Sequence, residues 1–424
     1  MCKGTRPLSL LSDSRAGGHV VASTPAWLLR VFAVIAVLGL IASMPSASAG
    51  DEATWISAFV MGHSNYIWHN PFRILFLRDP IFRHAIFPTQ DLLTPGEKER
   101  LDRVYYPRTR DLLIRSYDLI VFHDLYGWQF TSRQVFDLDY AFREAGMTAI
   151  CGLAESWDHV WQPTILADLL PVSEHKSTQA FVNRPYWVKF RTERDPVFLP
   201  FVDLGIEKVF GNNYCLMTAR QGATIWGDIM PAEIPWMVSW RPGGSDAGMQ
   251  WIVSQTFDPW WAEENNPYAL DVATNMIFYS LGWPLISDIH ARREARHLFA
   301  NVQTQKSLIL SMMEWADTFG AKTLTLSERL TDLEDEMEGA IRDYMEQDYA
   351  ATISFLESMP PTVSEIAKDA MRLKDEVLFW VYLVEWLTVT SVGIIAGVAV
   401  WSLMVRRRMY RIIETTRLSS LEEL

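Results

Sequence analysis

Cysteine is scarce in this sequence, and so is net positive charge. The 424 residues contain three cysteines, Cys2, Cys151 and Cys215. We expect the segment that holds Cys2 to be removed, so at most one disulfide could form, and a disulfide-stabilised scaffold is excluded. The formal net charge is -13. Such an acidic balance argues against a nucleic-acid partner, because binding nucleic acid needs a basic face.

Histidine pairs with metal-binding spacing are also lacking. His63 and His69 are six residues apart in a predicted loop, whereas a pair on one helical turn would be four apart. The acidic run from Asp332 to Glu338 is expected to be the solvated face of a helix. The sequence therefore predicts no metal site and no cofactor.

Tryptophan, in contrast, is abundant. The chain has 18 tryptophans and 49% hydrophobic residues, which is enough for one or two sizeable cores. Most of the large aromatic side chains are expected in those cores, although the same residue types also form sugar-binding and interfacial surfaces.

Residues 1–49 are predicted to be a signal peptide. Basic residues precede the apolar run Val31–Ile41, which is too short to span a bilayer comfortably, and the small residues Ala47-Ser48-Ala49 form a cleavage pattern. An uncleaved signal anchor is the alternative interpretation. In either case the following segment would be exported.

Residues 377–405 are predicted to be a transmembrane helix. The run is apolar, has tryptophans near both ends, and is followed by Arg406, Arg407, Arg408 and Arg411. The positive-inside rule then places the tail, residues 406–424, in the cytoplasm and the main domain outside it. We thus expect a single-pass protein of the cell membrane, with the lipid bilayer as a partner.

Glu385 is the one acidic residue inside this run. An interfacial position near the outer end is the ordinary explanation, and a polar contact that faces a helix bundle is the functional one.

Residues 289–376 have the pattern of amphipathic helices, predicted to form a helical bundle or a coiled-coil stalk. Thr325 with Glu328, and Thr362 with Glu365, have the spacing of capping boxes. Pro360-Pro361 is predicted to end the second helix. Such a stalk could support self-association or bind a protein partner.

The centre of the chain, Tyr117–Trp157, reads as a strand, a helix and a strand. Leu119–Phe122 and Met147–Ile150 are short apolar runs without polar alternation, which is typical of strands buried in a parallel sheet. Thr131–Ala145 between them has helix-compatible residues and ends at Gly146. Ligands of such sheets bind beyond the carboxyl ends of the strands.

Those ends carry residues that could do chemistry. They are His123 and Asp124 after the first strand, and Cys151 and Glu155 after the second. Asp124 and Glu155 could act as an acid and a base on adjacent strand ends. The predicted binding cleft consists of Asp124, Tyr126, Trp128 and Trp157.

Residues 50–288 resemble the class I glutamine amidotransferase-like superfamily, most closely its uncharacterised "putative glutamine amidotransferase" branch. The likeness rests on the central unit, on the Asp79-Pro80 turn before it, on the stretch Trp161–Val172 and on the Ser239–Asp258 hairpin. It implies a flavodoxin-like αβα sandwich with a mostly parallel sheet. The helical stalk and one transmembrane helix would follow this domain.

Catalytic members of that superfamily have a Gly-x-Cys-x-Gly elbow and a late His-x-Glu pair. Here Ala149 and Leu153 flank Cys151, and the late segment Thr256–Glu264 has no histidine. A nucleophilic cysteine needs a nearby base to become a thiolate, and His123 is the candidate. Otherwise Cys151 is a buried structural thiol.

Three hypotheses follow. The first is a membrane-anchored, extracytoplasmic binding or interaction module that has lost the catalytic triad. The second is an exported hydrolase of amide, ester or sugar bonds that uses Cys151 or the Asp124 and Glu155 carboxylates. The third is a stalked envelope protein whose tryptophan-rich face packs on surface polymers.

Overall fold

The structure is a computed structural model of the chain. It describes residues 55–62, 71–88, 93–123, 130–152, 164–173, 181–191, 196–206, 209–254, 257 and 259–421. Residues Thr54–Leu424 form one compact unit. The predicted signal peptide, residues 1–49, lies outside the described residues.

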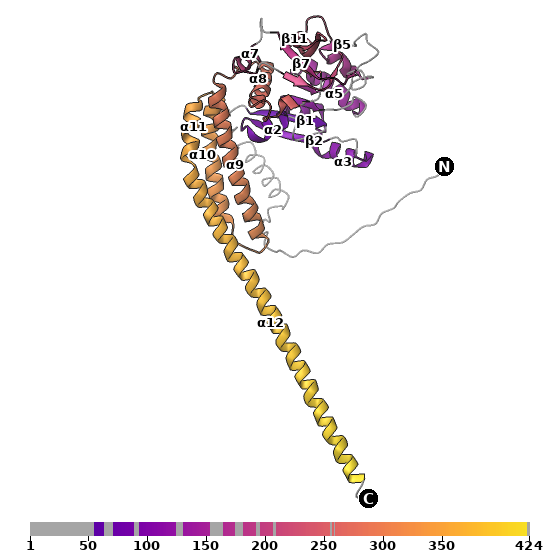
Figure 1. Ribbon diagram of the computed structural model, residues 1–424, viewed down its shortest axis with the longest axis vertical. Helices are drawn as coiled ribbons and strands as arrows, with labels where there is room; N and C mark the ends of the chain where they lie inside the picture. Colours follow the sequence, from indigo (N-terminus) through magenta and orange to yellow (C-terminus); the bar gives the residue numbers. More distant parts are fainter. Residues whose placement is uncertain are drawn as a thin grey trace, which may run out of the picture. The chain divides into compact units, whose positions relative to one another are not determined.

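A nine-stranded sheet with the order β2-β1-β3-β4-β13-β12-β11-β7-β8 is the framework of the described part (Figure 1). The first five strands are mutually parallel, and only β12 and β7 run against the others. The predicted α/β class with a mixed, mostly parallel sheet is therefore confirmed. The strands of this sheet are β1 (Ile56–Gly62), β2 (Phe82–Pro88), β3 (Leu119–His123), β4 (Thr148–Gly152), β7 (Tyr186–Phe190), β8 (Val209–Gly211), β11 (Thr224–Met230), β12 (Ile234–Trp240) and β13 (Gln250–Val253).

Two short strand pairs lie beside this sheet, and helices occupy much of the remaining chain. The paired strands are β5 (Val172–Ser173) with β10 (Thr218–Ala219), and β6 (Phe181–Val182) with β9 (Tyr214–Cys215). The helices are α2 (Pro71–Arg78), α3 (Pro95–Tyr105), α4 (Arg110–Ser116), α5 (Ser132–Arg143), η2 (Ile165–Leu169), α7 (Leu199–Val202), η4 (Pro259–Trp261), α8 (Ala269–Leu281), α9 (Ile289–Asp317), α10 (Leu324–Met345), α11 (Tyr349–Ser358) and α12 (Pro360–Leu421).

The predicted strand–helix–strand unit is β3, α5 and β4. Thr131 caps α5, since its hydroxyl accepts from the backbone of Gln134 while the Gln134 side chain accepts from Thr131 N–H. Gly146, with φ of 72°, takes the left-handed turn that follows the helix, a conformation glycine adopts at little cost. Both strands are buried along their full lengths, as the absence of polar alternation predicts.

Helices cover both faces of the sheet, so the side chains of each strand alternate between two cores. Val121 and Ile150 belong to the core that includes α2 and α8, whereas Phe122 and Cys151 belong to the core that includes α4 and α5. The first core continues into α9–α12. The helical segment after residue 288 thus shares a continuous core with the sheet.

The helices after residue 288 begin and end at other residues than the sequence predicts. Helix α10 ends at Met345, well before the two prolines, because Gln347 has φ of 64° and Asp348 starts α11 by accepting from Ala351 N–H. The Thr325–Glu328 capping box is wrong, since the N-cap of α10 is Thr323 and makes no side-chain cap hydrogen bond.

Helix α11 ends at Ser358, just before Pro360 and Pro361, and the two prolines then begin α12. Proline suits the first helical turn, where backbone N–H groups have no partner within the helix. The predicted Thr362–Glu365 capping box fails for the same reason, because both residues lie inside α12.

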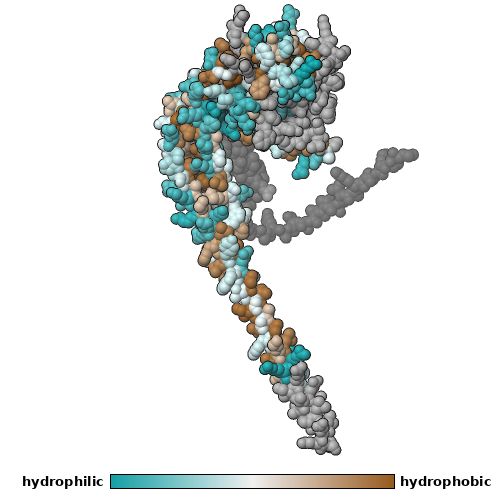
Figure 2. Space-filling view, in the orientation of Figure 1, coloured by the Kyte–Doolittle hydropathy of each residue, from teal (hydrophilic) through white to brown (hydrophobic). Residues whose placement is uncertain are grey.

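Helix α12 runs without a break from the bundle into its apolar half. Val363 and Ile366 are buried against the other helices, whereas from Leu378 to Val405 almost every large apolar side chain is exposed. By length and composition, the described residues contain one helix that could cross a membrane. Figure 2 shows hydrophobic residues along α12 beyond the end of the bundle.

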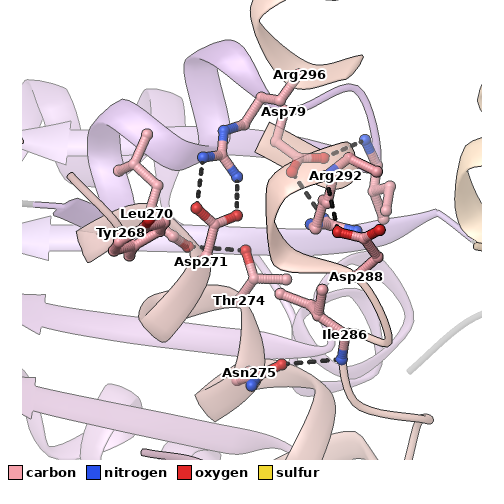
Figure 3. Close-up of polar contacts among 12 residues, drawn as sticks. Asp79, Tyr268, Leu270, Asp271, Thr274, Asn275, Ile286, Asp288, Arg292 and Arg296 are labelled. Atoms are coloured by element: carbon pink, nitrogen blue, oxygen red, sulfur yellow. Dashed lines mark hydrogen bonds and ion pairs between the residues drawn. The ribbon is translucent and has the colours of Figure 1, made fainter. Parts of the chain in front are cut away.

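Two buried ion pairs join α9 to the α/β part (Figure 3). Arg292 Nη2 donates to Asp79 Oδ2 at 2.8 Å, and Arg296 binds both carboxylate oxygens of Asp271 in α8. Tyr344 of α10 also donates to Asp79 Oδ2, at 3.0 Å. All five side chains are at most 3% exposed, so water does not screen these contacts.

Burial disfavours the charged form of Arg292, but the combined interactions with Asp79, Tyr344 and Tyr349 outweigh it and raise the pKa of the guanidinium. The rings of Phe278 and Tyr344 lie 5.2 and 4.5 Å from its central carbon, which supplies cation–π attraction. Two nitrogens of this guanidinium, Nε and Nη1, have no hydrogen-bond partner among the described residues.

We expect Asp79→Asn to destabilise the full chain by about 3–5 kcal/mol, because it leaves Arg292 as an uncompensated buried charge. The matched control is Glu263→Gln, which breaks the partly exposed pair with Arg78 and should cost about 0–1 kcal/mol. Chemical unfolding of the detergent-solubilised protein, followed by tryptophan fluorescence, measures both. Equal losses of stability in the two variants would contradict the role given to Asp79.

Candidate functional site

The carboxyl ends of β3 and β4 place His123 and Cys151 on opposite faces of the sheet. Phe122 is in register with Cys151 and His123 with Gly152. Since neighbouring side chains of a strand point to opposite faces, Cys151 shares the face of Phe122, in the core with α5. His123 lies on the other face, with its ring 5.5 Å from that of Phe257. The structure therefore does not bring the predicted nucleophile and base together.

Cys151 is a core residue. It is 1% exposed and forms no disulfide. Its strand neighbours in register, Phe122 and Ile252, are buried apolar side chains of the same core. A thiol in such surroundings is inert, because burial disfavours the thiolate. This is the structural-thiol alternative of the sequence analysis.

The other predicted site residues lie outside the described part of the chain. They are Glu155 of the catalytic set and Asp124, Tyr126, Trp128 and Trp157 of the predicted cleft. His63 and His69 also lie outside it. Within the described residues there is no group of three or more His, Cys, Asp or Glu that could hold a metal ion.

Aromatic side chains cover the end of β4 on the His123 face. Phe257 lies 5.1 Å from Phe72 and 5.6 Å from Trp261, measured between ring centroids. A Cβ atom on Gly152 would lie 2.9 Å from the Phe257 ring, so glycine there lets the ring close over the strand end. The space above β4 on this face is thus filled by side chains.

The same aromatic residues come from the late segment in which the resemblance stated above predicts a His-x-Glu pair. Phe257, Trp260 and Trp261 are each at most 1% exposed. Trp261 lies 6.4 Å from Trp236 of β12 in a stacked arrangement. In this chain these aromatic residues contribute packing, and Glu263 of the same segment pairs with Arg78 at 2.7 Å.

Strands β1 and β3 approach each other closely at the point where the strand order of the sheet reverses. Gly62 ends β1 with φ of 109°, and a Cβ there would lie 1.8 Å from the carbonyl oxygen of His123. Only glycine can occupy this position without displacing the β3 backbone. The two strand ends therefore meet backbone to backbone, at the edge where ligands of such sheets bind.

A separate hollow of about 520 Å³ lies between α3, residues 106–108 after it, and the start of α5. Its charged groups are largely engaged nearby. Arg103 pairs with Glu99 at 2.8 Å, and Arg133 pairs with Asp137 at 3.2 Å while also donating to the Pro107 carbonyl. Such locally paired, exposed charges indicate a solvated surface rather than a reactive centre.

No protein-family profile matches the chain, and no curated protein matches it. Two solved structures show a weak likeness. The cytoplasmic protein STM3548 from Salmonella typhimurium is 13% identical with a TM-score of 0.41, covering 53% of this chain and 98% of that one. The cytoplasmic protein STM1381 from Salmonella typhimurium LT2 is 13% identical with a TM-score of 0.38, covering 53% of this chain and 97% of that one.

Sequence reasoning missed two features of this region. Asp79 is predicted only as part of a turn, whereas Arg292 and Arg296, four residues apart on a predicted amphipathic helix, lie on one helical face. The segment with Phe257 is described above only as lacking histidine. Its Phe-Asp-Pro-Trp-Trp sequence also indicates aromatic packing.

The burial of Cys151 can be tested with a thiol reagent. In a Cys2→Ser variant, we expect neither Cys151 nor Cys215 to react with an aromatic disulfide reagent while the protein is folded, since both are buried. Both should react after unfolding in guanidinium chloride. A Cys151→Ala variant assigns the signal. Rapid labelling of Cys151 in the folded protein would restore the nucleophile hypothesis.

The covering of β4 by Phe257 can be tested at Gly152. We expect Gly152→Ala to cost about 1–3 kcal/mol of stability, because the ring must move. The control is Gly96→Ala in α3, where an added Cβ meets nothing and the change should be neutral or slightly stabilising. A Phe257→Leu background should reduce the cost of Gly152→Ala in a double-mutant cycle. An additive cycle would show that Phe257 does not close this end.

Proposed function

We propose that this chain is a membrane-anchored, extracytoplasmic module that acts by binding rather than by catalysis. In this proposal its α/β domain is a flavodoxin-like αβα sandwich of the class I glutamine amidotransferase-like superfamily. Residues 377–405 are its single transmembrane helix, and the helices between act as a stalk. The observation that carries the proposal is the continuity of α12, which is buried in the bundle at one end and apolar and exposed beyond it.

The strand order supports the flavodoxin-like part of the proposal. The parallel strands follow one another as β2-β1-β3-β4-β13, which is the order 2-1-3-4-5 of flavodoxin-like sheets when β13 counts as the fifth. In that order the ligand crevice lies outside the ends of β1 and β3. Gly62 and His123 end these two strands and lie in register, and the predicted cleft residue Asp124 follows directly.

The absence of an assembled Cys–His pair favours binding over catalysis. Cys151 is enclosed in one core, and His123 packs on the opposite face against Phe257. General-base activation requires the two groups within hydrogen-bond reach. The cleft residues Tyr126, Trp128 and Trp157 are then proposed to supply contact area rather than chemistry.

The charges after α12's apolar stretch support the proposed orientation. Arg406, Arg407 and Arg408 follow Val405 directly. Cations at this position are retained on the cytoplasmic side, so the bundle and the sheet would lie on the outer side.

The proposal predicts a definite topology in the cells that produce the protein. We expect an impermeant maleimide to label Glu338→Cys on α10 in intact cells, and to label Met409→Cys only after permeabilisation. Both positions are exposed, and a Cys2→Ser background leaves only the buried Cys151 and Cys215 as native thiols. Both variants should stay in the membrane pellet after alkaline carbonate extraction. Labelling of Met409→Cys in intact cells, or release by carbonate, would refute the proposed anchoring.

The same cells test whether the protein has hydrolase activity that depends on Cys151. Membranes that carry Cys151→Ala should hydrolyse amide and ester probes at the rate of membranes that carry the unmodified chain. A lower rate with equal protein levels would favour the exported-hydrolase hypothesis instead.

A further inference from the structure

A groove of about 590 Å³ lies where the turn between α9 and α10 meets α12. We call it the turn groove. One side is the turn itself, with Phe319 and Lys322, and the other is the first part of the apolar stretch of α12. On α12 the apolar lining residues are Leu373, Val377, Trp380, Val381 and Val384, and the carboxylates Glu376 and Glu385 also line the groove. The groove thus adjoins the proposed span and is continuous with its apolar surface.

The turn exposes large apolar side chains at the end of the helical hairpin. Phe319 is 52% exposed and Leu324 is 70% exposed. The Trp315 ring lies 4.9 Å from Phe319, so an aromatic pair faces the same end. Exposed apolar groups gathered beside an apolar groove mark an interaction surface.

The length of the apolar stretch places this turn at a definite depth. Roughly 29 residues at 1.5 Å each make residues 377–405 about 43 Å long. A bilayer is about 30 Å thick in its hydrocarbon core and about 40–45 Å thick with its headgroup layers. If Arg406 marks the inner surface, about 20 residues fill the hydrocarbon and residues 377–385 lie in the outer headgroup layer.

The residues at that level are those that favour a membrane interface. Trp380 and Tyr382 are more than half exposed, as is Trp386, the next residue after this range, and tryptophan and tyrosine collect at the headgroup level. Glu385 also lines the groove, at a depth where water and headgroups still solvate a carboxylate. Lys322 on the turn can extend its ammonium group towards a lipid phosphate.

We infer that the α9–α10 turn is a second membrane contact. It would be seated in the outer headgroup layer, with the acyl chain of a phospholipid in the turn groove and Lys322 beside the lipid phosphate. This inference rests on the proposed anchoring by residues 377–405. It makes the base of the stalk rest directly on the bilayer, so that the sheet is held at a fixed height by two contacts instead of one.

Fluorescent labelling at three exposed positions tests the inference on the full chain. Leu324→Cys, Leu308→Cys and Val398→Cys, each in the Cys2→Ser background, are labelled with an environment-sensitive fluorophore. The proteins are reconstituted in phosphatidylcholine vesicles that carry a spin label either high on the acyl chain or near its end. Leu308 is the matched control, a 61% exposed leucine on α9, about 16 Å along the helix from Phe319.

We expect the label at Leu324 to lose emission to the shallow spin label, the label at Val398 to lose emission to the deep one, and the label at Leu308 to lose emission to neither. If Val398 is quenched while Leu324 behaves as Leu308 does, the second contact is wrong and the anchoring stands. If Val398 is not quenched by either lipid, the anchoring itself fails and the inference fails with it.

A second measurement avoids dependence on a label at Leu324. Phe319→Ser should shift the tryptophan emission of the vesicle-bound protein to longer wavelength, because Trp315 loses its neighbour and gains water. Leu308→Ser should leave that emission unchanged. Equal spectra for the two variants would count against the turn as a membrane contact.

Discussion

One buried carboxylate holds the two halves of the described structure together. Asp79 accepts from the Ile81 backbone within its own turn, from Arg292 of α9 and from Tyr344 of α10. These partners are up to 265 residues away in the chain. Leaving any of the groups unpaired in an apolar interior costs several kcal/mol, so the sheet, α9 and α10 are fixed in a single arrangement.

The same constraint explains why the helices after residue 288 are not an independent stalk. Arg296 reaches Asp271 of α8 from the next turn of α9, and the apolar core runs across this junction. Separating the helical segment from the sheet would expose two buried pairs at once. The α/β part and the helices therefore unfold as a coupled unit, and the apolar half of α12 is attached to that unit directly.

The sequence predicts the parts of the fold that depend on local pattern. Unbroken apolar runs predict β3 and β4, and Gly146 marks the end of the helix between them. It could not predict which side of the sheet each catalytic candidate faces, because that depends on register. If β3 and β4 paired in a register shifted by one residue, Cys151 would lie beside His123. Nor could local pattern show the additional break at Gln347, where φ is 64° and the rings of Tyr344 and Tyr349 pack on each other across the turn.

The prolines at the start of α12 have a mechanical consequence. Because they lie in its first turn, the helix has no kink between the bundle and the apolar stretch. A tilt of the apolar half would be carried undiminished into the bundle, and from there, through Arg292 and Arg296, into the sheet. In the proposed membrane arrangement, a change in bilayer thickness that tilts the helix would tilt the bundle and the sheet together with it.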